Sequence, residues 1–220
     1  MFNLLRMDLR RLFKTRSFYI ILGVTAGLIL MVMLLTAVVS DPETLDYVGV
    51  HGGEIDEIDR RMSEEIRNMT QLDLAYEVLG GGFLLVIAGI GVTLFVSGDF
   101  TSGFVKNICC AQPRRINYVL SKALTAGVYS AVITLLGTLL ILLAPYLYGM
   151  RPAPNAISDI LRYLFWMWLP HWAFAMMALA LVLLTRSATL GIILSLVAGG
   201  GLTAVMAGKL GKLLGWPPLE

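Results

Sequence analysis

The sequence predicts an all-α polytopic membrane protein, in which an N-terminal helix at the membrane interface is followed by five transmembrane helices. Of its 220 residues, 57% are hydrophobic and 15% are charged, whereas ordinary soluble domains carry about 25% charged residues. Five runs free of Asp, Glu, Lys and Arg are as long as a bilayer-crossing helix, roughly 20 residues. The runs are continuously apolar rather than alternating, which favours helices over a barrel. We expect a single transmembrane domain over residues 1–220, with spans at about 18–39, 78–98, 123–147, 163–185 and 187–208.

Residues 1–17 are predicted to form an amphipathic helix. Its leucines and phenylalanines share one face, and three cations at four-residue steps lie on another. The cations are Arg6, Arg10 and Lys14. This pattern is typical of a helix that lies among the lipid headgroups. The alternative is a positively charged flank that only orients the first span.

The distribution of charge predicts the topology. Cations concentrate before the first span and in segment 99–122, and the positive-inside rule assigns both to the cytoplasm. Segment 40–77 is rich in Asp and Glu and is expected to be extracytoplasmic. The chain is therefore predicted to be a multi-pass protein of the cytoplasmic membrane with its N-terminus in the cytoplasm.

The predicted extracytoplasmic segment carries a second helical pattern. Apolar residues recur in it at three- and four-residue steps, as expected for one face of a helix. They are Ile55, Ile58, Met62, Ile66, Met69, Leu72 and Tyr76. This face is predicted to pack on the outer ends of the spans or on a partner chain. A solvated connecting helix is the alternative.

Small residues and one histidine stand out within the predicted spans. Glycines at Gly23 and Gly27, at Gly89 and Gly91 and near residue 200 would let helix backbones approach closely. His171 follows a proline and lies among tryptophans in the fourth span. An ionisable residue within a span is a candidate for the transport path. The alternative is a structural histidine whose hydrogen bonds are satisfied locally.

The sequence lacks the motifs of an enzyme. It has no Walker A sequence, no His-Glu-x-x-His, no Cys-x-x-Cys and no Gly-x-Ser-x-Gly. The predicted spans hold no Asp, Glu, Lys or Arg, which weakens the case for a proton- or sodium-coupled carrier or a selective cation channel. We therefore expect no catalytic residue, no metal and no cofactor in this chain. If it moves a substrate, the energy comes from another subunit.

The polar segment between the second and third spans is the predicted functional site. Phe100, Phe104 and Ile108 are spaced as one helical face and could enter a groove on a soluble partner. Cations nearby could contact the rim of that groove or lipid headgroups. The candidate residues are Asp99, Phe100, Ser102, Gly103, Phe104, Lys106, Ile108, Arg114 and Arg115. An ordinary basic loop that obeys the positive-inside rule is the alternative.

These features, in this order, resemble a type-2 ABC transporter permease, the integral membrane subunit of many bacterial exporters. The resemblance rests on Leu4-Leu5-x-x-Asp8-Leu9-x-x-Leu12, on Gly98-Asp99-Phe100-Thr101-Ser102-Gly103, on Arg114-Arg115 and Leu120-Ser121-Lys122, and on the turn Leu183-Leu184-Thr185-Arg186-Ser187-Ala188. It implies that 99–122 is a coupling segment that binds an ATPase. Phe104 stands where the family often has Thr, and Cys109-Cys110 replaces small or apolar residues. The family has six spans, so this chain is expected to be a truncated form.

The resemblance implies a function and a set of partners. The chain would be a permease subunit in the bacterial cytoplasmic membrane, moving a lipophilic molecule, drug or peptide. A separate subunit would hold ATP and Mg, and a second permease subunit, identical or related, would complete the complex. Lipid is an expected partner and nucleic acid is not. The alternatives are a non-transporting membrane anchor or assembly protein that recruits a soluble partner, and a channel.

Overall fold

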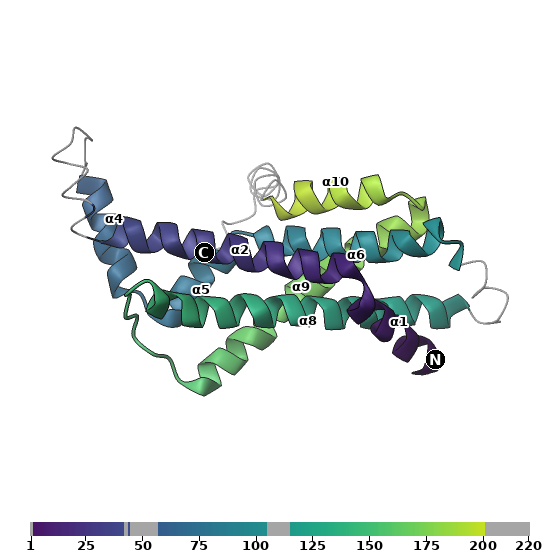
Figure 1. Ribbon diagram of the computed structural model, residues 1–220, viewed down its shortest axis with the longest axis horizontal. Coiled ribbons are helices and arrows are strands. Elements are labelled where there is room, and N and C mark those ends of the chain that lie inside the picture. The colour runs from purple at the N-terminus through teal and green to yellow at the C-terminus, as the bar shows by residue number, and fades with distance from the viewer. Residues whose placement is uncertain (1, 42–43, 45–56, 105–114, 201–220) are drawn as a thin grey trace, which may run out of the picture. The chain divides into compact units, whose positions relative to one another are not determined.

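The computed structural model describes residues 2–41, 44, 57–104 and 115–200, and these residues form helices without a strand. In chain order (Figure 1), the helices are α1 (Phe2–Lys14), α2 (Arg16–Ser40), α4 (Glu57–Asn68), α5 (Gln71–Gly80), α6 (Phe83–Thr101), α8 (Arg115–Leu147), α9 (Ile157–Thr185) and α10 (Ala188–Gly199). The all-α prediction is confirmed for this part of the chain.

Four helices are long and apolar enough to cross a membrane. They are α2, α6, α9 and residues Ile116–Leu147 of α8. These helices are what a helical integral membrane protein requires. The fifth predicted span, 187–208, begins as the apolar helix α10, but residues after 200 lie outside the described part. The count of five spans therefore stays a prediction.

The helices differ in extent from the predicted spans, whose bounds in a membrane stay predictions. The polar segment was placed at 99–122, but α6 continues to Thr101 and α8 begins at Arg115. Both helices thus extend past the apolar runs and carry charged residues in their end turns. The second span was predicted from 78, but α6 begins at Phe83, because Gly82 adopts the left-handed conformation at its start, with a φ of 81°. The fourth helix, α9, begins at Ile157 instead of 163.

The chain divides into two compact units. One comprises Met1–Ile21, Gly81–Thr134 and Met167–Glu220, and the other comprises Leu22–Gly80 and Leu135–Trp166. We call them the first and second units. Helices α2, α8 and α9 contribute residues to both.

In the first unit, α10 packs along α6 in the antiparallel sense through small residues. A Cβ added at Gly191 would lie 2.6 Å from Thr93 Oγ1, and one added at Gly89 would lie 2.9 Å from Ser195 Cβ. Farther along, a Cβ at Gly82 would overlap the carbonyl oxygen of Gly199. Residues of this size allow two backbones to approach closely in lipid. We call this contact the small-residue seam.

The turn between α9 and α10 has the tight form that the sequence predicted. Helix α9 ends at Thr185, and Arg186 adopts a positive φ of 56°. The Ser187 hydroxyl then accepts a hydrogen bond from the Leu190 N–H, which caps the start of α10. The capping explains why the chain can reverse direction within two residues.

In the second unit, the predicted extracytoplasmic helix is divided in two. The break lies at Met69–Thr70, where the Asp73 carboxylate accepts hydrogen bonds from the Thr70 N–H (3.0 Å) and hydroxyl (2.7 Å). The Thr70 hydroxyl accepts in turn from the Asp73 N–H at 3.3 Å. This reciprocal pair starts α5 as a new helix.

The structure covers the predicted apolar face of this segment only in part, and Leu72 is the member of it that is buried. Met62 and Tyr76 are 49% and 54% exposed, whereas α5 buries Leu72, Leu74, Ala75 and Leu79. The break changes the helical phase, so Leu74, Ala75 and Leu79 are buried together with Leu72, and packing of the predicted face on a partner chain stays a prediction. Helix α5 is instead held by the Tyr163 hydroxyl, which donates to the Ala75 carbonyl at 3.1 Å, and by Gln71 Nε2, which donates to the Tyr146 hydroxyl at 2.7 Å.

Candidate functional site

Four charged side chains from three helices meet inside the first unit. Asp8 and Arg11 come from α1, Asp99 from the last turn of α6, and Lys122 from the start of α8. Lys122 Nζ lies 2.6 Å from Asp8 Oδ1 and 2.7 Å from Asp99 Oδ2. Arg11 forms an ion pair with the other oxygen of Asp99. We call these four residues the ion cluster.

Hydroxyl groups complete the hydrogen bonding of the two carboxylates. The Tyr118 hydroxyl donates to Asp99 Oδ2 at 3.0 Å, and the Ser121 hydroxyl donates to Asp8 Oδ2 at 2.7 Å. Both donors lie on α8, within one turn of Lys122. Each carboxylate is therefore held by a cation and by a neutral donor.

Aromatic rings surround the cations. The Arg11 guanidinium lies 4.6 Å from the centre of the Phe104 ring, and Lys122 Nζ lies 4.8 Å from the centre of the Phe95 ring. Rings at this distance attract a cation through their negative faces. They also exclude water, so the charges interact in a medium of low dielectric constant.

The cluster is electroneutral, and three of its members are closed to solvent, whereas the side chain of Arg11 is 30% exposed. Asp8 and Asp99 are fully buried, and Lys122 is 1% exposed. Removing a charge from water costs several kcal/mol, which is recovered only when an opposite charge and further hydrogen bonds are in place. Each buried charge must therefore keep an opposite charge beside it, and this requirement fixes α1 against the ends of α6 and α8.

The local sequence of each helix explains the convergence. In α1, Leu4, Asp8 and Leu12 are spaced four residues apart and form the buried row. In α8, Tyr118 and Lys122 are one turn apart and face the same way. The side chains of Leu4 and Tyr118 pack together, with Phe104 and Leu183 against them. An apolar layer thus covers the ion cluster.

The structure places the predicted coupling residues in different surroundings. Asp99 is buried in the ion cluster, so its carboxylate cannot contact a soluble partner in this arrangement. Phe104 is half-buried beside Arg11. Ser102 is exposed and donates to the Gly98 carbonyl at 2.7 Å.

The remaining coupling residues are only partly covered by the structure. Phe100 is half-buried, and Gly103 has a φ of 69°, which favours glycine. Arg115 is the first residue of α8. Lys106, Ile108 and Arg114 lie outside the described residues. The proposed face of Phe100, Phe104 and Ile108 is therefore untested.

The predicted cationic row of the N-terminal helix is exposed, as its spacing indicates. Arg6, Arg10 and Lys14 lie away from the buried row of α1. Phe2 and Phe13, assigned from the sequence to the apolar face, are 82% and 41% exposed. The face of α1 that packs on protein is instead centred on Asp8.

His171 lies inside the first unit and is 2% exposed. Its Nδ1 contacts the Met167 carbonyl oxygen one turn earlier in α9, and its Nε2 has no hydrogen-bond partner among the described residues. The flanking indoles of Trp168 and Trp172 stack, and they donate to the carbonyls of Gly127 and Ala123 on α8 at 3.0 and 3.1 Å. The Nδ1 contact agrees with a structural histidine. Because Nε2 has no described partner, a role of His171 in the transport path stays a prediction.

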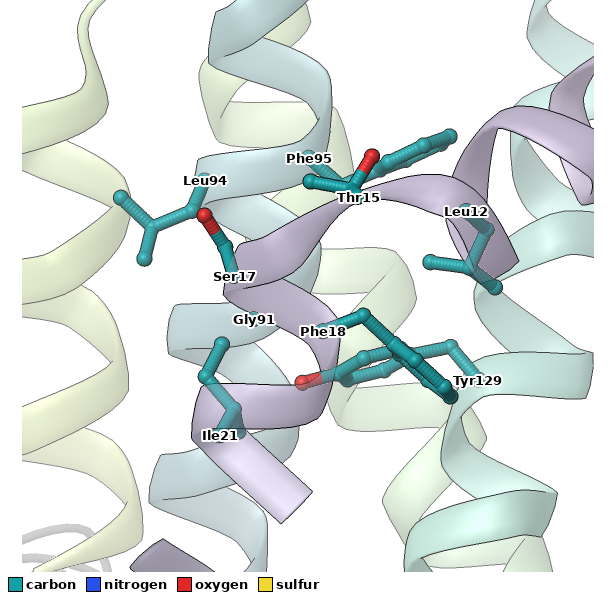
Figure 2. Close-up of a pocket in the computed structure, with 9 residues that line it drawn as sticks. All are labelled: Leu12, Thr15, Ser17, Phe18, Ile21, Gly91, Leu94, Phe95 and Tyr129. Atoms are coloured by element: carbon teal, nitrogen blue, oxygen red, sulfur yellow. The ribbon is translucent and has the colours of Figure 1, made fainter. Parts of the chain in front are cut away.

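A small cavity of about 40 Å³ lies in the first unit (Figure 2), and its lining residue Phe95 also contacts Lys122 of the ion cluster. Leu12 and Phe95 line it on the side of α1 and α6, and Phe18, Ile21 and Tyr129 line it on the side of α2 and α8. A water molecule needs about 10–15 Å³, so the cavity is suited to water and not to an organic substrate. The Tyr129 hydroxyl, which has no partner in the described part of the chain, is a polar group at its wall.

Sequence reasoning missed most of the ion cluster. Arg11 was counted only as a positive-inside charge, Lys122 only as such a charge and as part of the family resemblance, and Asp8 only within the leucine pattern of the N-terminal helix. The signal was present, because Asp8 interrupts the row of Leu4 and Leu12 at four-residue spacing. An acidic residue in the middle of an apolar row needs a buried cation. No group of His, Cys, Asp and Glu suited to a metal occurs among the residues that the structure covers.

The fold and the site together define a helical membrane protein in which the N-terminal helix is fixed by buried charges to both helices that flank segment 105–114. Comparison with models of known protein families, with curated proteins and with solved structures found no match in any of the three.

Proposed function

We propose that this chain is the membrane-spanning permease subunit of an ATP-binding cassette exporter, driven by ATP hydrolysis on a separate subunit. The observation that supports the proposal is the ion cluster. It joins α1, the end of α6 and the start of α8 into one body. A soluble subunit that bound segment 99–122 would therefore act on three helices at once.

The buried charges give this body a way to transmit movement. A shift of α8 at Lys122 would separate Lys122 from Asp8 and Asp99 unless α1 and α6 followed it. Leaving buried charges unpaired costs about 3–5 kcal/mol, so concerted movement is favoured over separation. Closure of two ATPase subunits would then move α1, α6 and α8 together, a rigid-body shift of packed helices.

The proposed complex contains two permease subunits and two ATPase subunits in a bacterial cytoplasmic membrane. ATP and Mg belong to the ATPase subunits, and this chain provides the binding surface and the spans. The proposed substrate class is a lipophilic molecule, drug or peptide, in keeping with the apolar spans. The N-terminus and segment 99–122 lie on the cytoplasmic side in this proposal.

The test begins with the partner. The tagged full-length chain is cross-linked in its native membranes and purified, and the recovered proteins are searched for an ATPase with Walker motifs. The pair is then reconstituted in proteoliposomes, and ATP hydrolysis is measured with and without this chain. We expect the chain to stimulate hydrolysis.

Two variants locate the contact. Arg114→Glu reverses a charge in the proposed coupling segment, and Phe104→Ala removes its half-buried ring. Both are expected to reduce ATPase recovery and stimulated hydrolysis. Glu64→Arg, an equal charge reversal at an exposed position of α4, is the control and is expected to retain both. If Phe104→Ala and Arg114→Glu both leave recovery and hydrolysis unchanged, the coupling assignment is wrong.

The alternative function, a membrane anchor or assembly protein, uses the same binding segment. It predicts recovery of a soluble partner without stimulated hydrolysis and without transport. A channel predicts currents in a planar bilayer in the absence of any partner. Either result would overturn the exporter proposal.

A further inference from the structure

The second unit contains an open cleft of about 420 Å³, a volume within the range of small-molecule sites. The cleft lies where α2 and α8 end. Its lining includes Leu34 and Val38 of α2, Arg67 of α4, and Tyr148 and Arg151 after α8. It belongs to neither the ion cluster nor the proposed coupling segment.

One side of the cleft is apolar. Leu34 and Val38 are one turn apart on α2 and are 45% and 43% exposed. The Tyr148 hydroxyl donates to the Leu30 carbonyl at 3.3 Å, which holds the chain after α8 against α2. These side chains provide a hydrocarbon wall at the end of two helices that are long enough to span a bilayer.

The other side carries three charges. Arg67 Nη2 donates to the Ser40 carbonyl at 3.3 Å, which fixes the guanidinium beside the cleft. Arg151 is exposed, follows the turn at Gly149 and makes no ion pair with any residue that the structure describes. Asp41 accepts a hydrogen bond from the Thr44 hydroxyl at 2.8 Å through Oδ2, and its Oδ1 has no donor among the residues that the structure describes.

We infer that this cleft binds a phospholipid whose headgroup carries both a phosphate and a primary ammonium group. Guanidinium groups bind phosphate oxygens through paired, charge-assisted hydrogen bonds, and Arg67 and Arg151 supply two of them. Asp41 accepts from the ammonium group. The acyl chain lies along Leu34 and Val38. The apolar wall of the cleft thus contacts the acyl chain, and the charged wall contacts the headgroup.

The charge balance selects this headgroup over its two common relatives. A purely anionic headgroup such as phosphatidylglycerol would match the arginines but offer Asp41 only neutral hydroxyl donors, which bind a carboxylate more weakly than an ammonium group does. A quaternary ammonium headgroup has the same charges but no N–H to donate to Asp41. The inference depends only on insertion of the chain in a bilayer, and not on the exporter proposal.

The test is native mass spectrometry of the full-length chain released from vesicles that contain equal amounts of phosphatidylethanolamine, phosphatidylglycerol and phosphatidylcholine. We expect phosphatidylethanolamine to be retained about tenfold more than either competitor. This ratio corresponds to the one charge-assisted hydrogen bond that its ammonium group donates to Asp41. Equal retention of the three lipids would mean general contact with the bilayer and would overturn the inference.

Variants separate the roles of the charges. Arg151→Gln is expected to lower retention of phosphatidylethanolamine and phosphatidylglycerol about tenfold. Asp41→Asn is expected to abolish the preference between them while leaving phosphatidylglycerol bound. Arg162→Gln and Asp159→Asn, at exposed positions of α9 in the same unit, are the matched controls. The site is misassigned if the controls lose as much lipid as the cleft variants. Circular dichroism verifies that each variant retains its helices.

Discussion

Lys122 and Asp8 are almost completely buried and their charged groups lie 2.6 Å apart, although 114 positions separate them in the chain. Neither residue is near the centre of an apolar run. The contact places an ion pair where the N-terminal helix meets the third long helix, and several properties of the protein depend on it.

Replacing the lysine of this pair is expected to be strongly destabilising. Lys122→Met removes one positive charge and leaves Asp8 without its cation, at an expected cost of about 3–5 kcal/mol in the free energy of unfolding. Thermal unfolding in detergent micelles measures the loss. Lys14→Met, which removes an exposed lysine from α1, is expected to leave the midpoint unchanged.

The double variant Asp8→Asn with Lys122→Met tests whether the cost comes from the unpaired charge. It leaves the Arg11–Asp99 pair intact and the cluster neutral. We expect the double variant to be more stable than Lys122→Met alone. Simple addition of the two single losses would contradict a direct ionic interaction.

The close approach of Gly91 to Tyr129 predicts a steric effect. A Cβ at Gly91 would overlap the Tyr129 hydroxyl, so Gly91→Ala is expected to destabilise the protein by about 1–3 kcal/mol, as overpacking does. Gly27→Ala is the control, because an added Cβ there would meet nothing within 4 Å. Tyr129→Phe is expected to cost little, since its hydroxyl has no described partner. The unfolding midpoints of the three variants, measured in one detergent, test this steric effect.

The small-residue seam predicts a cross-link. In a background with Cys109 and Cys110 changed to Ser, Gly89→Cys with Ser195→Cys is expected to form an intramolecular disulfide on mild oxidation, because the two Cβ positions are 2.9 Å apart and need only a small separation. Peptide mass spectrometry detects the bond. Leu94→Cys with Ser195→Cys is the comparison, since Leu94 is 40% exposed and lies on another face of α6. Equal cross-linking of both pairs would contradict the packing.

The start of α5 predicts a titration. Hydrogen bonds from the Thr70 hydroxyl and N–H hold the pKa of the Asp73 carboxyl below its ordinary value of 3.8. A lowered folded pKa means that the interaction stabilises α5 above pH 3.8 and is lost as the pH falls through the folded pKa. Carboxyl NMR is expected to record an upward shift of this pKa in Thr70→Val but not in Thr70→Ser. An unchanged value in Thr70→Val would refute the capping interpretation.

The sequence predicted the class of the protein because bilayer insertion depends on the length and polarity of continuous runs. The structure also has a helix that starts close to the first predicted span, α2, and a tight turn at Arg186 where the sequence predicted one. Helices α6 and α8 extend past the predicted spans because Asp99 and Lys122 neutralise each other, whereas charge alone places each of these residues at the end of a span. The pairing depends on how the helices pack, and its one local sign is Asp8 within an apolar row.

The sequence predicted only part of the candidate site, because the pairing of its charges depends on how the helices pack. Segment 99–122 was identified from its charge; Asp99 belongs to the ion cluster, and Phe104 lies beside it. Yet the sequence treated Asp99 as a surface group and did not find its partners Lys122 and Tyr118, which depend on how α6 and α8 pack. The break at Thr70 was missed because the apolar spacing continues through it, and only the side-chain hydrogen bonds with Asp73 reveal it.

The ion cluster also has a consequence for the order in which the protein is assembled. Asp8 and Arg11 are synthesised first, whereas Lys122 emerges more than a hundred residues later. Asp8 cannot enter an apolar interior before Lys122 is available to neutralise it. Helix α1 must therefore remain at the water–lipid boundary during synthesis and take its final place after α8 has been inserted. A helix that is synthesised before α8 is thus packed after it.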